Sequence, residues 1–308
     1  MQRIFFILIF VTLTFGSANL FSSCGKEDPI EVIPPNPGSE DESDEPIVTG
    51  STLSANGNSS QTYQLIEGAG YGNEAPDLYG VHTSVQHITQ SYDQSLERNV
   101  FDFHIHIDED NDRGKETITD RQRNEIKTDD KSPDALLGFK GETVEYRWYF
   151  MLPSAMKTTT SFTHVHQIKG IDNDEGDADV SMPIVTFTLR TKSSKQQFEI
   201  KYTEPTEDGG DSNELIIADL ADFLGQWVEV KEIIKYADAG VYSVEIKRCS
   251  DNKILVDLDN VKIKTWRTGT PAMRPKWGIY RHFGENGSNK DQLRDETLKF
   301  AEFYINKL

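Results

Sequence analysis

Cysteine is scarce in this sequence: Cys24 and Cys249 are the only two among 308 residues, too few for a framework of disulfides. Also missing are a His-Glu-x-x-His motif, a phosphate-cradling glycine loop and a Gly-x-Ser-x-Gly motif. Their absence leaves metalloprotease, nucleotide-binding and serine-hydrolase functions without support. There is no basic tail and the formal net charge is −19, so we expect no nucleic-acid partner.

The N-terminus has the pattern of a lipoprotein signal peptide. Arg3 precedes a short apolar run over residues 4–15, and small residues lead from there to Cys24. We expect residues 1–23 to be removed and Cys24 to be lipidated; an ordinary signal peptide with an incidental cysteine is the alternative. Residues 26–28 resemble the signal that sends some Gram-negative lipoproteins to the cell surface. The prediction is a protein held at the outer membrane by its lipid anchor alone.

Residues 24–60 are predicted to form a disordered tether. They are rich in Pro, Gly, Ser and acids and poor in large apolar residues, so they cannot bury enough surface to fold. Residues 26–45 hold eight acids against one lysine, and such a segment extends by self-repulsion. The remaining stretch, residues 61–308, is long enough for one all-β domain and shows neither an internal repeat nor a second linker.

Short runs that alternate apolar and polar residues dominate this domain and predict β-strands. They are residues 101–107, 144–150, 184–189, 227–234, 242–247 and 297–305. A helical turn or two is expected, for example near residues 132–136 and 220–224, but no long amphipathic helix. Many strands at this spacing predict an all-β sandwich of two antiparallel sheets, one of them concave and lined with polar side chains.

Three predicted strands carry the side chains most suited to chemistry. Residues 123–127 read Arg-Asn-Glu-Ile-Lys, residues 167–170 read Gln-Ile-Lys-Gly, and residues 276–280 read Lys-Trp-Gly-Ile-Tyr. Since side chains alternate between the faces of a strand, each segment gathers these residues on one face: Arg123, Glu125 and Lys127; Gln167 and Lys169; Lys276, Gly278 and Tyr280. Removing a proton beside a carboxylate needs charge neutralisation, a base and a proton donor, and these residues supply all three.

The same segments, in the same order, resemble the signatures of the jelly-roll polysaccharide lyases, the group of alginate, heparin and glucuronan lyases. The alginate-lyase patterns Arg-x-Glu-x-Arg, Gln-Ile-His-Gly and Lys-x-Gly-x-Tyr match them with two departures, Lys127 for the second arginine and Lys169 for the histidine. The resemblance spans residues 61–308, and the ordered co-occurrence of the motifs gives it its value. It implies a concanavalin-like β-jelly roll with a concave polar cleft, β-elimination on an acidic polysaccharide, and no cofactor.

The resemblance also implies roles for single residues. Arg123 and Gln167 would hold a uronate carboxylate, and Tyr280 would protonate the leaving glycosidic oxygen. The base would be Lys169 or one of two histidines, because alternation over residues 101–107 puts both on one polar face, and an imidazole suits proton abstraction at neutral pH. These two are His104 and His106. Further substrate contacts are expected from Lys276, Lys127, Glu125, Arg281 and Trp277.

A second pair of histidines raises a question of register. His164 and His166 lie on the face opposite Gln167 and Lys169 unless a bulge intervenes. The motif match favours Gln167 and Lys169 in the cleft, so both histidines are expected to face away from it.

Two acidic loops invite a calcium interpretation. Their members are Asp108, Asp110 and Asp112 in the first, and Asp172, Asp174, Asp177 and Asp179 in the second. The first loop fails the EF-hand spacing, because Arg113 takes the glycine position and Thr119 the glutamate position. We expect solvated turns and no bound metal, with calcium kept as the alternative.

The sequence therefore predicts a monomeric surface lipoprotein that cleaves a uronate-containing polysaccharide. Lys169 in place of histidine favours a glucuronan-like polymer over alginate or a glycosaminoglycan. One alternative is a glycan-binding lipoprotein without catalysis, which the tether and aromatics such as Trp148, Trp266 and Trp277 would also fit. Another is a glycoside hydrolase, which would need two carboxylates, such as Glu125 with Glu145 or Asp102.

Overall fold

The computed structural model describes residues 50–205 and 212–308. The predicted signal peptide, Cys24 and most of the predicted tether lie outside the described residues. The folded unit begins ahead of the expected boundary at residue 61, because β1 (Ser51–Leu53) pairs with the C-terminal strand β15 (Glu296–Lys307) and buries Leu53 in the core. Among the described residues, no helix is both long enough and apolar enough to cross a membrane.

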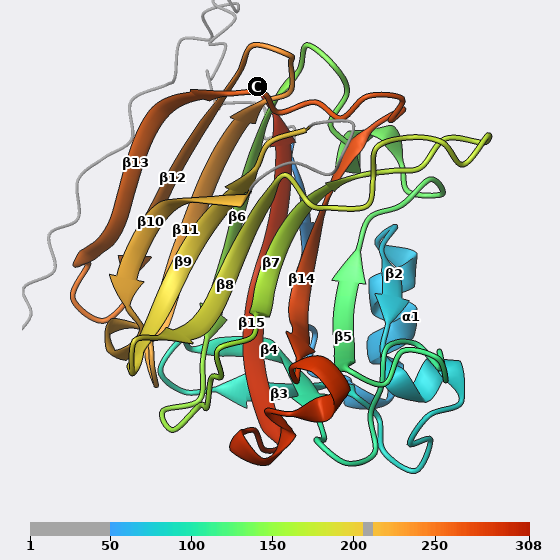
Figure 1. The fold of residues 1–308 in the computed structure, drawn as a ribbon, viewed down its shortest axis with the longest axis vertical. Coiled ribbons are helices and arrows are strands. Elements are labelled where there is room, and N and C mark those ends of the chain that lie inside the picture. Colours follow the sequence, from blue (N-terminus) through green and yellow to red (C-terminus); the bar gives the residue numbers. More distant parts are fainter. Residues whose placement is uncertain (1–49, 206–211) are drawn as a thin grey trace, which may run out of the picture. The chain divides into compact units, whose positions relative to one another are not determined.

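Two antiparallel sheets stack on each other, so the predicted sandwich is confirmed (Figure 1). The larger sheet has the order β13-β12-β11-β6-β15-β4-β3, with β1 also on β15. Its strands besides β1 and β15 are β3 (Ile88–Asp93), β4 (Arg98–Ile105), β6 (Thr143–Met151), β11 (Trp227–Lys235), β12 (Gly240–Arg248) and β13 (Ile254–Ile263). The six strands predicted above are found as β4, β6, β8, β11, β12 and β15.

The seven-stranded sheet has the order β10-β9-β8-β7-β14-β5-β2. Its strands are β2 (Gly72–Glu74), β5 (Arg121–Lys127), β7 (Thr163–Gly170), β8 (Val185–Lys192), β9 (Lys195–Thr203), β10 (Ser212–Asp219) and β14 (Met273–His282). The three motif segments become β5, β7 and β14, and β14 lies between the other two (Figure 1). Segments far apart in the chain thus become neighbours.

Alternate side chains of both sheets fill the space between them. Trp148 of β6 and Trp277 of β14 are fully buried, with ring centroids 6.4 Å apart, and Phe150, Phe187 and Phe300 pack around Trp148. Each such side chain stabilises the fold by about 1.5–3 kcal/mol through removal of apolar surface from water. The side chains of the inner faces are therefore buried in the core, and only those of the outer faces can contact a ligand.

Helices are few and short in the part of the chain that the structure describes. The expected helical turns form as the 3₁₀ segments η3 (Asp134–Leu136) and η4 (Leu220–Asp222). The structure contains further 3₁₀ segments that were not predicted: η1 (Ser59–Gln61), η2 (Pro76–Tyr79), η5 (Glu285–Gly287) and η6 (Lys290–Gln292). One α-helix, α1 (Thr62–Gly68), was not predicted; it buries Ile66 against the core. Its seven residues are too few for helical periodicity to be recognised.

Candidate active site

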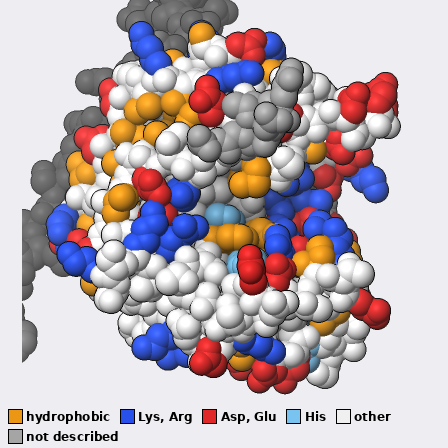
Figure 2. Space-filling view, viewed as in Figure 1, with side chains coloured by type: hydrophobic (Ala, Val, Ile, Leu, Met, Phe, Trp, Pro, Cys, Tyr) orange, Lys and Arg blue, Asp and Glu red, His pale blue; other side chains and the backbone are white. Residues whose placement is uncertain are grey.

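The outer face of the seven-stranded sheet is hollowed into a cleft of about 440 Å³, lined by residues from all seven strands and from adjoining loops. Lys and Arg side chains gather around this hollow (Figure 2). Nine lining residues are cationic and only one, Glu74, is acidic; the cations are Arg113, Arg121, Arg123, Lys127, Lys169, Arg190, Lys201, Arg274 and Lys276. A local field of this sign attracts an anionic ligand even though the whole chain is acidic.

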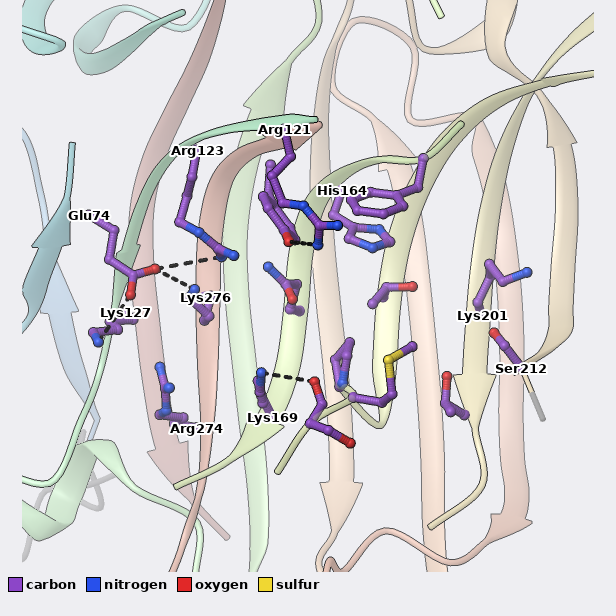
Figure 3. A pocket seen from close by; sticks show the side chains of 18 of the residues that line it. Glu74, Arg121, Arg123, Lys127, His164, Lys169, Lys201, Ser212, Arg274 and Lys276 are labelled. Carbon is purple, nitrogen blue, oxygen red and sulfur yellow. Dashed lines mark hydrogen bonds and ion pairs between the residues drawn. The ribbon is translucent and has the colours of Figure 1, made fainter. Parts of the chain in front are cut away.

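The strand register aligns the motif residues in rows across the cleft floor. In one row, Lys276 of β14 lies opposite both Lys127 of β5 and Gln167 of β7. In the next row, Tyr280 lies opposite both Arg123 and His164. The predicted sharing of faces within each motif therefore extends to contacts between motifs (Figure 3).

A β-bulge in β7 brings His164 into the cleft. His164 pairs with Thr188 of β8 and His166 with the adjacent Phe187, so β7 carries one extra residue, Val165. Both Val165 and His166 are buried, whereas His164 and Gln167 line the cleft. The expectation that both histidines face away thus holds for His166 but not for His164, because the bulge shifts the alternation by one residue.

The two histidines have opposite surroundings. Nδ1 of His164 is 2.8 Å from Thr188 Oγ1, and its ring stacks on Phe162 with centroids 4.3 Å apart. Burial lowers the pKa of His164 to about 3, which leaves a neutral imidazole facing the cleft. His166 is enclosed between Trp148 and Trp277, with Nε2 3.0 Å from Glu232 Oε2, and is part of the core.

Tyr280 is held between two arginines. Arg121 Nη1 donates a hydrogen bond of 2.9 Å to the phenol oxygen, and the Arg123 guanidinium lies 3.6 Å from the ring centroid. Because arginine can only donate, the phenol oxygen accepts from Arg121 and its own hydrogen remains available to a ligand. The two positive charges would also stabilise a phenolate. Arg121 was missed by the sequence reasoning, although it lies two residues before Arg123 and so shares its face.

Glu125 is fully buried beneath the cleft and connects three motif residues. It accepts hydrogen bonds from Gln167 Nε2 at 2.5 Å and from Arg123 Nη1, and its Oε2 is 2.8 Å from Lys276 Nζ. Burial alone would raise the pKa of Glu125, but Lys276 and Arg123 lower it below its usual range. Glu125 is therefore ionised, and it orients the side chains of Gln167, Arg123 and Lys276.

Glu74 of the edge strand β2 is a second carboxylate with several cationic partners. Lys127 Nζ is 3.2 Å and Arg113 Nη1 3.1 Å from its Oε1, and Lys276 contacts its Oε2. Burial would raise its pKa, yet Lys276 and Arg123 lower it well below the usual range. Glu74 could not be recognised from the sequence, because a three-residue strand is too short to show a periodicity.

Lys169 projects into the cleft, where its Nζ donates to the Ser181 carbonyl at 3.2 Å (Figure 3). Burial, together with the positive charges of Lys276 and Arg274, lowers the pKa of Lys169 to about 7. A substantial fraction of this lysine is therefore neutral at neutral pH, and the neutral amine is a base. Lys169, which stands where the alginate-lyase pattern has a histidine, thus has a pKa close to that of a histidine.

Gly278 allows β14 and β5 to approach each other under the cleft. Its φ is +141°, and a Cβ at this position would overlap the backbone of Asn124 and Glu125. Any larger residue would push β5 away and displace Glu125. The glycine of Lys-x-Gly-x-Tyr is therefore required by close packing of the backbone.

Five predicted site residues do not line the cleft: Glu125, expected to contact substrate, is fully buried beneath it, and four others lie away from it. His104 is on β4 of the other sheet, where its ring nitrogens contact Thr89 and Thr297; His106 follows this strand. Arg281 and Trp277 point into the interior because they alternate with Lys276 and Tyr280, and Arg281 is bound by Gln122 Oε1 and the Arg294 carbonyl. The polar face carrying His104 was recognised, but alternation does not tell to which sheet a strand belongs.

The two acidic loops do not converge on a shared point. Asp108 is exposed beside Lys290, Asp110 turns toward histidines, and Asp112 binds Arg123. In the second loop Asp179 pairs with Arg267 and Asp177 with Asn173. Over residues 50–205 and 212–308, neither loop supplies three carboxylates close enough to hold one cation.

No family model matches this chain, and no curated protein sequence matches it. Solved structures do match. The marine PL-14 alginate lyase from Aplysia kurodai is 10% identical, covering 83% of this chain and 98% of that chain, with a TM-score of 0.52. An endo-β-1,4-glucuronan lyase from the fungus Trichoderma reesei is 14% identical, covering 77% and 94%, with a TM-score of 0.49. The chain thus has the jelly-roll sandwich found in polysaccharide lyases, and at these identities the likeness concerns the fold.

Proposed function

We propose that this protein is a polysaccharide lyase that cleaves a uronate-containing polysaccharide by β-elimination. One observation carries the proposal: a cationic cleft holds a phenol, Tyr280, between two arginines, with a lysine of lowered pKa on the same floor. β-Elimination needs a neutralised carboxylate, a base for the proton at carbon 5 and an acid for the leaving oxygen at carbon 4. Each requirement has a candidate in the cleft.

Gln167 and the surrounding cations would receive the carboxylate. One amide hydrogen of Gln167 binds Glu125, and the second is free to donate to a ligand. Arg123 is already bound by Asp112 at 2.9 Å and by Glu125, so it contributes positive charge more than an open donor fork. Together they would stabilise the enolate-like charge that develops when the proton at carbon 5 leaves.

Lys169 and Tyr280 would move the two protons. The neutral amine of Lys169 takes the proton from carbon 5, the electron pair forms the double bond between carbons 4 and 5, and the bond from carbon 4 to oxygen breaks. The departing oxygen takes the phenol hydrogen of Tyr280, and Arg121 and Arg123 stabilise the phenolate. His164 stays neutral and, because its pKa is about 3, is a much weaker base than Lys169.

The favoured substrate is a β-linked glucuronate polymer, since Lys169 departs from the alginate pattern.

A glycoside hydrolase would require a protonated carboxylic acid. Glu74, which lines the cleft, and Glu125, buried beneath it, are the carboxylates nearest Gln167, Lys276 and Arg123, and neighbouring cations lower the pKa of both, so neither is suited to donate a proton. Anchoring at the outer membrane through a lipid on Cys24 remains part of the proposal. Replacing Cys24 by serine would then release the protein from the membrane fraction.

The test is ultraviolet absorbance of the conjugated double bond that β-elimination creates. The chain lacking residues 1–24 is mixed with glucuronan, alginate, heparin, hyaluronan and pectin in turn. We expect absorbance to rise with one of these polymers, glucuronan first, and Tyr280→Phe to abolish the rise while preserving the fold. Polymer binding in an affinity gel without any rise would instead support a glycan-binding protein.

A further inference from the structure

A cluster of three histidines and one aspartate lies outside the cleft. His82 and His87 come from the loop between η2 and β3, and His106 and Asp110 come from the loop after β4. Asp110 is at the centre, with Oδ1 3.2 Å from His82 Nδ1 and 2.8 Å from His87 Nε2. Its Oδ2 is 3.3 Å from His106 Nδ1. One ligand atom from each of the four residues lies within 4.8 Å of all the others.

These separations suit a small tetrahedron. A zinc ion with bonds of about 2.0–2.1 Å places its ligand atoms about 3.3 Å apart, close to the observed contacts. The three imidazole rings pack edge to face, with centroid distances of 4.7, 5.2 and 5.3 Å, and one nitrogen of each ring lies within 4.8 Å of the others. Small side-chain adjustments would be enough to place all four atoms around one ion.

Groups behind the cluster hold its ligands in orientation. Nδ1 of the fully buried His87 is 2.9 Å from Asp77 Oδ1, and the Tyr63 hydroxyl donates to Asp77 at 2.8 Å. A hydrogen bond from Nδ1–H to Asp77 directs the lone pair of Nε2 toward the cluster, as is usual for metal-bound histidine. The backbone N–H of His106 donates to Asp110 Oδ2 at 2.6 Å and fixes that carboxylate.

We propose that His82, His87, His106 and Asp110 bind one Zn²⁺. Neutral imidazole nitrogens with a carboxylate oxygen form a ligand set that zinc favours, and four protein ligands leave no open position for catalysis. The site is therefore structural. The competing interpretation is a cluster joined by hydrogen bonds alone, with His87 bridging Asp77 and Asp110.

Zinc at this position would order the loop that supports Arg123. Next to Asp110, the Asn111 carbonyl accepts a hydrogen bond from the backbone N–H of Arg123 at 3.2 Å. One residue further, Asp112 binds the Arg123 side chain. The metal would position this arginine without touching the substrate.

The experiment measures metal content in the purified full chain by mass spectrometry, after dialysis against metal-free buffer. We expect about one zinc per chain in the wild type. The matched pair is His106→Ala and His104→Ala: the two histidines are two residues apart and both partly exposed, but only His106 belongs to the cluster. His104→Ala should retain the zinc, whereas His106→Ala should lose it.

Two further measurements test the zinc site even if His106→Ala folds poorly. Asp77→Asn leaves all four ligands in place and should weaken zinc binding by about 10–100-fold. Wild-type protein stripped of metal and given Co²⁺ should show the d–d absorption of a tetrahedral site. Failure of the wild type to bind either Zn²⁺ or Co²⁺, or equal zinc in both histidine variants, overturns the proposal. These readouts need no polysaccharide, so they are independent of the lyase assignment.

Discussion

The outer faces of the two sheets are both polar, but their charges are arranged differently. On the eight-stranded sheet, partly exposed lysines have separate acidic partners: Lys247 pairs with Glu229 at 2.9 Å and Lys299 with Asp93 at 3.2 Å. On the seven-stranded sheet, nine cations surround a hollow, and the carboxylates Glu74 and Glu125 lie buried among them. The first arrangement neutralises itself on the surface, whereas the second leaves positive charge for a ligand.

The comparison explains why a polar strand face does not by itself identify a site. His104 lies on a polar face of the larger sheet and binds Thr89 and Thr297, whereas burial and the neighbouring cations lower the pKa of Lys169 to about 7. Burial beside charge of the same sign lowers the proton affinity of a lysine, whereas an acidic partner raises it, as Glu229 raises the pKa of Lys247 on the larger sheet. Function should therefore respond to changes on one face only.

The largest expected effect comes from Lys169→Arg. Arginine keeps the positive charge but does not lose a proton in the neutral range, so turnover should fall by about 10²–10⁴-fold if Lys169 is the base. His104→Gln on the opposite face should leave turnover unchanged. Initial rates on the substrate found in the absorbance test measure both. Full activity in Lys169→Arg would mean that the residue supplies only charge.

Gly278→Ala should disturb the cleft floor through the backbone. A side chain at φ +141° that overlaps Asn124 and Glu125 should lower the free energy of unfolding by about 1–3 kcal/mol. Gly68→Ala, at the end of α1 with open space around its Cβ, should change it by less than about 1 kcal/mol. Urea denaturation of the two variants measures the difference, and equal midpoints would contradict the steric argument.

The pH dependence of turnover distinguishes the two candidate bases. Lysine acts as a base when neutral, so a pKa of about 7 for Lys169 predicts a rate that rises about tenfold between about pH 6 and about pH 8. His164, with a pKa of about 3, is neutral throughout this range and would give a flat profile. A flat profile in the wild type would transfer the role of base to His164.

Local alternation was sufficient to predict which motif residues share a face. Arg123, Glu125 and Lys127 do so, because β5 pairs with β14 in an unbroken register. Lys276 and Tyr280 both line the cleft as predicted, although the register of β14 against β7 shifts between Trp277 and Tyr280. The same rule places Arg281 with Trp277 in the interior, so its expected contact with substrate contradicted its own position in the strand. Which residues of one strand lie on the same face depends only on that strand, so it can be predicted from the sequence.

What depended on pairing between strands could not be predicted. The bulge that turns His164 into the cleft arises where β7 carries one more residue than β8, which neither strand reveals alone. Glu74 is placed by a short edge strand that pairs only with β5. The sheet to which His104 belongs follows from β4 pairing with β15 and β3, a choice made by the whole sandwich.

The smallest expected effect compares one arginine from each face. Arg190 of β8 lines the cleft, 3.9 Å from Glu199, whereas Arg147 of β6 is half exposed and 2.6 Å from Glu145. Arg190→Ala should raise KM by about fivefold, equivalent to about 1 kcal/mol, because a cation that faces an anionic polymer is lost. Added salt should shrink this difference, since salt screens attraction at a partly exposed site. Arg147→Ala should leave KM and its salt dependence unchanged, and a similar rise in both variants would show that the positive field is not confined to the cleft.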